Sequence, residues 1–357
     1  MSKNVHGGNV EDISRKYGVS SDKIIDFSAN INPVGLNENV KRAMIRALDK
    51  VEKYPDISYF NLKNAISKYE NIDTDNLVLG NGAAEVIFNI IRGLKPKKVL
   101  LPAPTFSEYE EGVLSIDGSV EYYHLKEKEN FELNNELISS LDESIDMIFI
   151  CNPNNPTGVL TKSTFIEFIA KRALETKTVV VVDESFLDFV GTEEEYTSKY
   201  LLEEYKNIVI VKSLTKFFAM PGIRIGYGIS KNSEITSLIN KVTVPWSVNI
   251  VASEAIVQAL KEEAYIRSSV EYVENEKNYL YESLKEIRKI KVFKPSVNFI
   301  MFRVLNMVDL KEELIKHNIL IRSCSNYEGL NNRFYRIAVR NREENNKLIS
   351  ALKDIFK

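Results

Sequence analysis

Residues 213–227 read Ser213-Leu-Thr-Lys216-Phe-Phe-Ala-Met-Pro221-Gly222-Ile-Arg224-Ile-Gly226-Tyr227 and follow an apolar run, residues 208–211, that predicts a buried strand. Two phenylalanines flank Lys216, so we expect little water around its amine. Loss of water lowers the pKa of a lysine and raises its neutral, nucleophilic fraction. Ser213 and Arg224 carry donors suited to a phosphate group. This combination suits a phosphorylated aldehyde cofactor, whereas a surface lysine after a strand is the plainer alternative.

Composition excludes several classes of protein. The chain has 357 residues, enough for about two domains, with 44% hydrophobic and 27% charged residues, as in an ordinary soluble globular protein. Its formal net charge of −3 does not indicate nucleic acid or an anionic membrane as partner. Because no apolar run approaches a membrane span and the first residues lack a signal-peptide core, we expect a cytoplasmic protein. Cys151, Cys324 and the three histidines show no metal-ligand spacing, so we expect no metal site.

Apolar runs alternate with amphipathic segments over residues 77–242. Several of the predicted strands are almost wholly apolar, which is typical of a mainly parallel sheet covered by helices on both faces. The last third of the chain predicts a smaller α+β unit. We therefore expect an α/β protein with an N-terminal arm (1–40) that joins the small domain, a large domain (41–254) and a small domain (255–357). The strands of the large domain are expected at 77–79, 98–101, 121–124, 147–151, 178–182, 208–211 and 226–230.

The turns after these strands are where ligands bind in a parallel sheet, because its sites lie beyond the carboxyl ends of the strands. The turn at Gly82 opens a predicted helix, and free amides at a helix start beside glycine form an anion site. Glu85 stands where the third glycine of a dinucleotide fingerprint would be, so the chain lacks that fingerprint.

Three further turns carry polar or aromatic side chains at strand ends. Asn155 begins the second of two Asn-Pro steps and can donate to a ring oxygen, although a stiff connection is the structural alternative. Asp183 ends a very apolar strand, and a buried carboxylate there needs a cationic or hydrogen-bonding partner: a pyridinium nitrogen, a metal, an arginine or a helix start. Phe106 could stack on a planar ring or belong to the core.

Taken in this order, the motifs resemble the fold type I pyridoxal-phosphate enzymes, the aspartate aminotransferase superfamily, over essentially the whole chain. The most specific parts are residues 152–158, the pair Asp183-Glu184 and residues 213–227. The resemblance implies a large domain whose mainly parallel sheet is sandwiched by helices, a smaller α+β domain, and pyridoxal 5′-phosphate as cofactor.

The same resemblance implies roles for single residues. Lys216 would bond the cofactor aldehyde and move protons, and Asp183 would pair with the pyridinium nitrogen. Asn155 would donate to the phenolic oxygen. Tyr54, in a Tyr-Pro-Asp motif, would reach the cofactor phosphate of a neighbouring subunit, which implies a homodimer. The remaining contacts would be Phe106 and Ser185 on the two faces of the ring, with Gly82, Ala83, Ala84, Ser213 and Arg224 on the phosphate.

Within this superfamily the chain resembles the histidinol-phosphate aminotransferase subgroup and, in it, the threonine-phosphate decarboxylases of cobalamin biosynthesis. The opening His6-Gly-Gly-Asn9 and residues 26–33, 245–249 and 321–327 carry the second likeness. Phe186 stands where the aminotransferases usually have a tyrosine, which favours the decarboxylases. These enzymes convert L-threonine O-3-phosphate to (R)-1-amino-2-propanol O-2-phosphate and CO2. The substrate residues would be Arg336 and Asn155 at the α-carboxylate, Arg322 as a second anion anchor, and His6 and Asn30 closing the site.

Two other functions stay open at this point. Amino transfer, to histidinol phosphate or a related compound, differs from decarboxylation in which Cα bond is held perpendicular to the cofactor ring. A non-catalytic ligand-binding domain on the same fold would not need Lys216, Asp183 and Asn155 together. A nicotinamide oxidoreductase is excluded, because the glycine fingerprint is missing.

Overall fold

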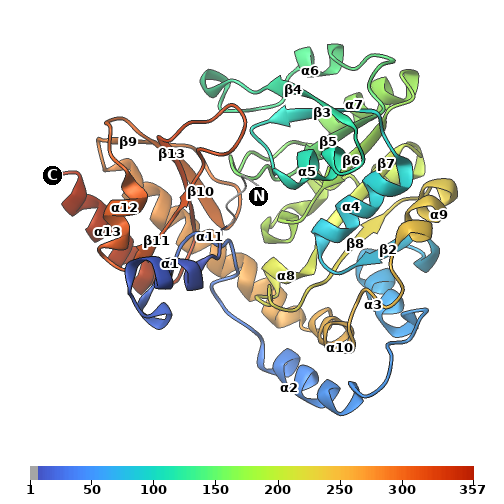
Figure 1. The fold of residues 1–357 in the computed structure, drawn as a ribbon, viewed down its shortest axis with the longest axis horizontal. Coiled ribbons are helices and arrows are strands. Elements are labelled where there is room, and N and C mark those ends of the chain that lie inside the picture. The colour runs from blue at the N-terminus through green and yellow to red at the C-terminus, as the bar shows by residue number, and fades with distance from the viewer. Residues whose placement is uncertain (1–6) are drawn as a thin grey trace.

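A seven-stranded sheet forms the centre of the larger region, on the right of Figure 1, in a computed structural model that describes residues 7–357. The strand order is β2-β8-β7-β6-β5-β3-β4. Five strands, β3 to β7, run parallel, whereas β8 runs antiparallel to both of its neighbours. The mainly parallel sheet is thus confirmed. Its strands are β2 (Leu77–Gly80), β3 (Lys98–Ala103), β4 (Ser119–His124), β5 (Met147–Cys151), β6 (Val179–Asp183), β7 (Ile208–Ser213) and β8 (Gly226–Ile229).

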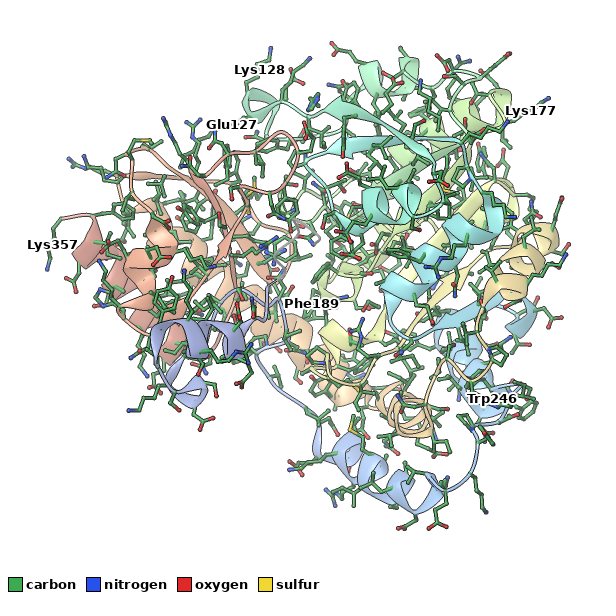
Figure 2. All side chains as sticks on the ribbon, viewed as in Figure 1. Glu127, Lys128, Lys177, Phe189, Trp246 and Lys357 are labelled. Atoms are coloured by element: carbon green, nitrogen blue, oxygen red, sulfur yellow. The ribbon has the colours of Figure 1, made fainter. Side chains whose placement is uncertain are left out.

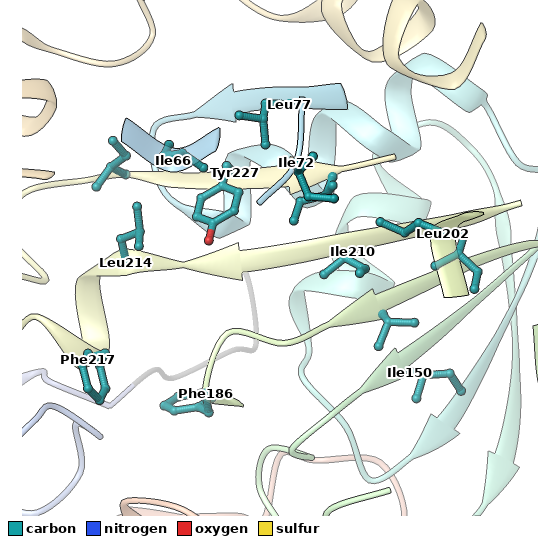
Figure 3. Close-up of a cluster of buried hydrophobic side chains, with 14 of the residues drawn as sticks. Ile66, Ile72, Leu77, Ile150, Phe186, Leu202, Ile210, Leu214, Phe217 and Tyr227 are labelled. Carbon is teal, nitrogen blue, oxygen red and sulfur yellow. The ribbon is translucent and has the colours of Figure 1, made fainter. Parts of the chain in front are cut away.

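Helices cover both faces of this sheet because its strands bury alternate side chains on opposite sides. Ile148 and Ile150 belong to the core on one face, and Met147 and Phe149 to the core on the other. Figure 3 shows part of the first face, where Ile150 comes from β5. The first face packs against α2 (Glu38–Ala47), α3 (Phe60–Glu70), α7 (Ser163–Glu175) and α10 (Ile250–Ala259), and the second against α4 (Ala83–Leu94), α5 (Glu108–Leu114) and α9 (Ser233–Val242).

A four-stranded antiparallel sheet forms the smaller region, on the left of Figure 1. Its order is β12-β13-β10-β9, and helices α11 and α13 pack on it. The long helix α11 runs from the larger region into the smaller one (Figure 1). The elements are α11 (Glu263–Lys285), β9 (Ile290–Val292), β10 (Phe299–Val304), α12 (Leu310–Ile315), β11 (Ile319–Leu320), β12 (Arg322–Ser323), β13 (Phe334–Ala338) and α13 (Arg342–Ile355).

The N-terminal segment packs on the smaller region. Helix α1 (Val10–Tyr17) is followed by β1 (Ile25–Asp26), which pairs in parallel with β11. Phe27 is fully buried in the core of the smaller region. This contact supports the predicted arm, while the domain boundaries at 40/41 and 254/255 stay a prediction. Short elements complete the chain: η1 (Ser21–Lys23), η2 (Leu48–Lys50), η3 (Thr74–Asn76), η4 (Glu127–Glu129), α6 (Asn135–Ser139), η5 (Leu187–Phe189), η6 (Glu193–Glu195), η7 (Lys199–Glu203) and α8 (Leu214–Phe217).

A buried ionic cluster lies beside β7. The ammonium of Lys212, a fully buried residue, lies 2.8 Å from Glu193 Oε1, 3.3 Å from Glu70 Oε1 and 3.6 Å from Asp188 Oδ1. Burial by itself would lower the pKa of Lys212, but the three carboxylates outweigh burial and hold it well above its ordinary value. We call these four residues the Lys212 cluster. It connects α3, the segment after β6, and the strand that leads to Lys216.

Residues 7–357 contain neither a membrane-spanning helix nor a cluster of metal ligands. None of their helices is both long and apolar enough to cross a bilayer. In the same part of the chain, no group of three or more His, Cys, Asp or Glu is placed to hold a metal ion.

Candidate active site

The carboxyl ends of β5, β6 and β7 bring three of the predicted turns together. In the sheet register Cys151 lies opposite Asp183, and Asp183 lies opposite Val211. Two residues later β7 ends at Ser213, and the short helix α8 carries Lys216. Asp183, Ser213 and Lys216 therefore lie together at the carboxyl ends of these strands, although long crossovers separate the strands in the sequence.

Lys216 has the nucleophilic character expected from its sequence context. Its Nζ donates a hydrogen bond to Ser213 Oγ at 2.9 Å and lies 5.7 Å from the centre of the Phe186 ring. Burial lowers the pKa of Lys216 to about 8; Arg224 acts in the same direction and Asp183 opposes it. Near neutral pH a useful fraction of this amine is therefore neutral and can attack a carbonyl carbon.

Asp183 is held by two hydrogen bonds. Its Oδ2 accepts from the Tyr109 hydroxyl at 2.7 Å, and its Oδ1 accepts from the backbone N–H of Ser185 at 2.9 Å. Burial and the Asp183 charge raise the pKa of Tyr109 well above its ordinary value, so the phenol stays protonated and donates. The Tyr109 ring stacks on Phe149 at 4.5 Å, which fixes its position. Sequence reasoning missed Tyr109, although it lies three residues after Phe106, in the first turn of α5.

Phe106 and Ser185 also lie beside this carboxylate. Phe106 is half-buried and meets the Tyr109 ring edge-on, with the ring centres 5.7 Å apart. Ser185 is buried, and its Oγ has no hydrogen-bond partner within residues 7–357. An unpaired buried hydroxyl is uncommon, and the Ser185 hydroxyl can therefore serve a bound ligand.

Asn155 contacts the predicted carboxylate anchor Arg336. Its Oδ1 accepts from Arg336 Nη1, and the Tyr327 hydroxyl lies 3.4 Å from the same oxygen. With Oδ1 engaged, the Nδ2 group of Asn155 is the one that can donate to a ligand. Arg336 Nη2 donates to the backbone carbonyl of Ser28 at 3.0 Å, and its buried Nε has no partner in the described chain.

Arg322 lies directly opposite Arg336 on the neighbouring strand. Directly opposed residues of antiparallel strands point to the same face, so the two guanidinium groups are neighbours. Arg322 donates to Asn326 Oδ1 at 2.9 Å and lies 5.5 Å from the Tyr327 ring centre. Both arginines are buried, and within residues 7–357 every hydrogen-bond partner of either guanidinium is uncharged.

The turn at Gly82 and the guanidinium of Arg224 form a compact anion site. Gly82 has φ of 94°, and a Cβ there would lie 2.3 Å from Arg224 Nη2. A Cβ on Gly226 would lie 2.4 Å from the backbone nitrogen of Ala83. Both positions therefore require glycine, which lets the start of α4 with Ala83 and Ala84 approach the arginine. Free amides at a helix start and a guanidinium together suit a phosphate.

Asn32 attaches the N-terminal arm to the helix that carries Lys216. Its backbone N–H donates to Lys216 O at 3.1 Å, and its Nδ2 lies 2.8 Å from Phe217 O, 2.9 Å from Ser269 Oγ and 3.2 Å from Tyr265 Oη. Sequence reasoning placed Asn32 in a turn, residues 28–32, that would close the site, but gave it no contact with Lys216 or Phe217. The Asn-Pro step in the arm signals a turn, but not the partner that the turn binds.

Two predicted residues, Tyr54 and Asn30, form no hydrogen bond with the other predicted site residues within the described chain. Tyr54 is 79% exposed, and its ring contacts Trp246 with ring centres 4.7 Å apart. Its hydroxyl forms no hydrogen bond with residues 7–357. Asn30 is buried in the arm with its Oδ1 unpaired in the described part of the chain. His6 lies outside the described residues.

Comparisons with known proteins agree with this arrangement. A family model described as aminotransferase class I and II matches residues 22–352. The chain is 34% identical to threonine-phosphate decarboxylase from Salmonella typhimurium, over 100% of this chain and 98% of that protein.

Solved structures of proteins with either activity are similar to this chain. The structure of histidinol-phosphate aminotransferase from Clostridium acetobutylicum has a TM-score of 0.86 and 35% identity, over 92% of this chain and 98% of that chain. The structure of L-threonine-O-3-phosphate decarboxylase from Porphyromonas gingivalis has a TM-score of 0.82 and 25% identity, with the same coverage. The fold, the turns that follow β5, β6 and β7, and the match to the family model lead to one conclusion: this chain belongs to the class I and II aminotransferase family.

Proposed function

We propose that this chain is a pyridoxal-phosphate-dependent lyase that decarboxylates L-threonine O-3-phosphate to (R)-1-amino-2-propanol O-2-phosphate and CO2 in cobalamin biosynthesis. The observation that carries the proposal is the pair of buried arginines, Arg322 and Arg336, whose only protein partners in the described chain are neutral. Two neighbouring buried cations without carboxylates are costly unless a ligand supplies negative charge. A substrate with a carboxylate and a phosphate supplies both charges.

The residues at the carboxyl ends of the strands fit pyridoxal phosphate. The unpaired Ser185 hydroxyl and the glycine-lined site at Arg224 offer partners for a ring and a phosphate. Lys216 would bond the aldehyde carbon, and Asp183 would accept from the pyridinium nitrogen. When bound, the cofactor supplies an electron sink for the pair left on Cα as a bond there breaks.

The chain's own residues account for the rest of the reaction. Arg336 holds the carboxylate next to Asn155, so the group that leaves as CO2 is fixed in place. Burial lowers the pKa of Lys216, and Lys216 delivers the proton that takes the place of CO2 on Cα. Phe186 packs edge-on against Phe299 with ring centres 5.2 Å apart and offers no hydroxyl to the cofactor, which favours decarboxylation over amino transfer.

We also propose that two copies form the active enzyme, with the partner subunit's Tyr54 completing the phosphate site. An exposed apolar surface surrounds Tyr54, and patches of this kind mark interfaces between proteins. Figure 2 shows Trp246 at the outer edge of the larger region. We call this surface the Tyr54 face; it comprises Ile45, Leu48, Val51, Tyr54, Ile57, Phe60, Val244 and Trp246. A cytoplasmic location is part of the proposal and fits the two free cysteines, Cys151 and Cys324.

One assay of the purified protein tests the reaction. With pyridoxal phosphate and L-threonine O-3-phosphate we expect CO2 and the amine product in equal amounts, with no need for 2-oxoglutarate. Lys216→Ala should abolish the release of CO2. Amino transfer that needs a keto acid, without CO2, would contradict the proposal and establish the alternative, histidinol-phosphate or related aminotransferase activity, which the 35% identity to the Clostridium enzyme favours.

A further inference from the structure

We infer that Glu127 and Phe131 are positioning residues for the reaction: they fasten the smaller region to the larger one and thereby fix the position of Arg336 relative to Lys216. The inference rests on the proposed function and deepens it, because it states what favours loss of CO2 over cleavage of another bond at Cα. Both residues act through the smaller region and not by contact with the reacting atoms.

The candidate active site is shared between the two regions. Lys216 and Asp183 belong to the larger region, whereas Arg336 lies on β13 of the smaller one. Which bond at Cα is perpendicular to the cofactor ring depends on where the carboxylate is held. The smaller region holds the carboxylate, and the larger region holds the ring. The relative position of the two regions therefore decides which bond breaks.

A cluster of buried apolar side chains lies between the two regions, apart from the cores of either one. The Phe131 ring of the larger region meets Phe293 edge-on, with ring centres 5.3 Å apart, and Phe334 with ring centres 6.2 Å apart. Only 3% of Phe131 is exposed, so this side chain is as buried as a residue of a domain core. The other members are Leu125 from the larger region and Met301, Cys324 and Tyr327 from the smaller one.

The backbone at Phe131 has an uncommon conformation. Asn130 and Phe131 have φ of 53° and 59°, so two successive residues other than glycine adopt the left-handed region. This conformation is costly for a bulky side chain and persists only where the surrounding contacts hold it. The amide of Phe131 donates to Lys126 O at 3.1 Å. The packing of the Phe131 ring on the smaller region is the tertiary contact that holds this turn.

A carboxylate of the larger region compensates two cations of the smaller one. Lys291 on β9 lies directly opposite Arg303 on β10, and like charges in such a position destabilise a pair of strands. Glu127 Oε1 lies 2.9 Å from Lys291 Nζ, and Glu127 Oε2 lies 2.7 Å from Arg303 Nη1. Figure 2 shows Glu127 where the two regions meet. Separation of the regions would leave the two cations facing each other without this carboxylate. We call the following six residues the seam: Glu127, Phe131, Lys291, Phe293, Arg303 and Phe334.

The seam lies on the same face of the smaller sheet as the carboxylate anchor. Phe334 and Arg336 are two residues apart on β13, so their side chains point to one face. Arg303 lies directly opposite Phe334, and Met301 lies directly opposite Arg336. Contacts that fix β13 at Phe334 therefore also fix Arg336, which is the next residue of that face along the strand.

The turn that carries Asn155 also contacts the smaller region. Ser296 Oγ donates to Gly158 O at 2.6 Å, and the Tyr327 hydroxyl lies 3.4 Å from Asn155 Oδ1. A movement of the smaller region would stretch both contacts, together with the hydrogen bond from Arg336 to Asn155. The seam thus protects the geometry on both sides of the site.

A loosened seam lets a second bond at Cα compete with loss of CO2. When Cα–H is perpendicular to the cofactor ring, Lys216 takes the proton, and the electron pair on Cα expels the phosphate from Cβ. A proton then returns at Cβ, and water replaces the amino group. In sum, L-threonine O-3-phosphate and water give 2-oxobutanoate, ammonia and inorganic phosphate. The ratio of 2-oxobutanoate to CO2 therefore reports the position of Arg336. It does not depend on how much of a variant is folded, because one active site makes both products.

Variants on both sides of the boundary test the inference in the holoenzyme. Phe131→Ala and Phe293→Ala should each raise the ratio of 2-oxobutanoate to CO2 at least about tenfold, because each removes a buried ring from the seam. Glu127→Gln should raise it about threefold, since partly exposed ion pairs are weak. Glu136→Gln is the matched control: it removes an ion pair with Lys126, 2.9 Å long and inside the larger region, and should leave the ratio unchanged.

Hydrogen–deuterium exchange of the holoenzyme separates this inference from the proposed reaction. Phe131→Ala should raise exchange about tenfold on both sides of the boundary, in residues 152–158 and 324–333, and Glu136→Gln should not. This result supports the seam even if wild type releases no CO2 and the proposed reaction fails. If Phe131→Ala does not fold, Glu127→Gln decides by the same two measurements. Exchange that rises on one side only, or an unchanged product ratio in folded variants that release CO2, would overturn the inference.

Discussion

Lys216 shows at the scale of one residue how burial prepares a nucleophile. Because the pKa of Lys216 is lowered to about 8, the neutral amine appears as the pH rises through 8 and not through 10.5. At pH 7 roughly one amine in ten is neutral. In cofactor-free protein we expect an amine-directed reagent to label Lys216 with a midpoint near pH 8, measured by mass spectrometry of the Lys216 peptide.

Two substitutions give the sign of each contribution to this pKa. Asp183→Asn removes a negative charge that raises the pKa of Lys216, so its midpoint should move down. Arg224→Ala removes a positive charge that lowers the same pKa, so its midpoint should move up. A midpoint near pH 10 in the wild type, or shifts of opposite sign, would contradict this account.

Sequence reasoning reached part of this residue-level description. The lowered pKa of Lys216 was predicted correctly, but the aromatic ring over its amine is Phe186 and not the adjacent Phe217 or Phe218. Phe217 packs against Phe189. Tyr109 could not be predicted as the partner of Asp183, because the two residues are 74 positions apart and meet only through the sheet register. The roles assigned to Tyr54, Asn30 and His6 stay predictions.

At the scale of elements, the arm segment from Ser28 to Asn32 connects the two ends of the site. Ser28 O accepts from Arg336, and the Asn32 N–H donates to Lys216 O. Asn32→Ala would remove the hydrogen bonds of a buried amide: Val34 N–H would lose its Oδ1 acceptor, and Phe217 O would keep, among the described residues, the Tyr265 hydroxyl at 3.3 Å. We expect a loss of about 2–3 kcal/mol in the free energy of unfolding, measured with urea.

Ser269→Ala is the matched control for Asn32→Ala, because it removes one of the three partners and keeps the others. It should cost about 1 kcal/mol. Equal losses in the two variants would mean that Asn32 is not the centre of this network. Contacts other than those of Asn32 would then hold the N-terminal arm in place.

Most elements were predicted to within a few residues, because their hydrophobic periodicity is strong. The strand β5 agrees with its predicted range, 147–151, at both ends, and β2 and β8 differ from theirs by one residue. The helix α8 was missed, because four residues are too few for a periodic signal and it is held by tertiary contacts to Asn32. The antiparallel direction of β8 also has no local signal, since it depends on the path of the whole chain.

At the scale of the molecule, the Lys212 cluster makes stability depend on pH. Burial raises the pKa of Asp188 from 3.8 to about 7; Glu193 and Glu70 act in the same direction, and Lys212 opposes them. The folded state therefore binds this proton more tightly than the unfolded state does. Its contribution to stability is complete below about pH 4 and is lost as the pH rises toward 7.

Asp188→Asn should remove this dependence. For wild type the contribution of Asp188 falls by at most about 1.4 kcal/mol per pH unit between pH 4 and 7. The difference in unfolding free energy between wild type and variant, measured in urea at pH 5, 6 and 7, should shrink or change sign as the pH rises. A difference that grows in favour of wild type at higher pH would contradict the assigned direction.

Association of two copies belongs to the same scale. Leu48→Glu places a charge on the Tyr54 face, so we expect a monomer by sedimentation and loss of activity, because each phosphate site then lacks the partner's Tyr54. Phe168→Glu is the control: Phe168 is also exposed, but it lies on α7 outside this face. Loss of association in both variants, or in neither, would contradict an interface at the Tyr54 face.

The contact between the rings of Trp246 and Tyr54 has a practical consequence. Trp246 is the single tryptophan of the chain, and it belongs to the proposed contact between subunits. Its fluorescence therefore comes from one known place, with no label attached. If the Tyr54 face is covered on association, the emission maximum of Trp246 should move to shorter wavelength as the protein concentration rises. The intrinsic fluorescence of the protein then measures its association.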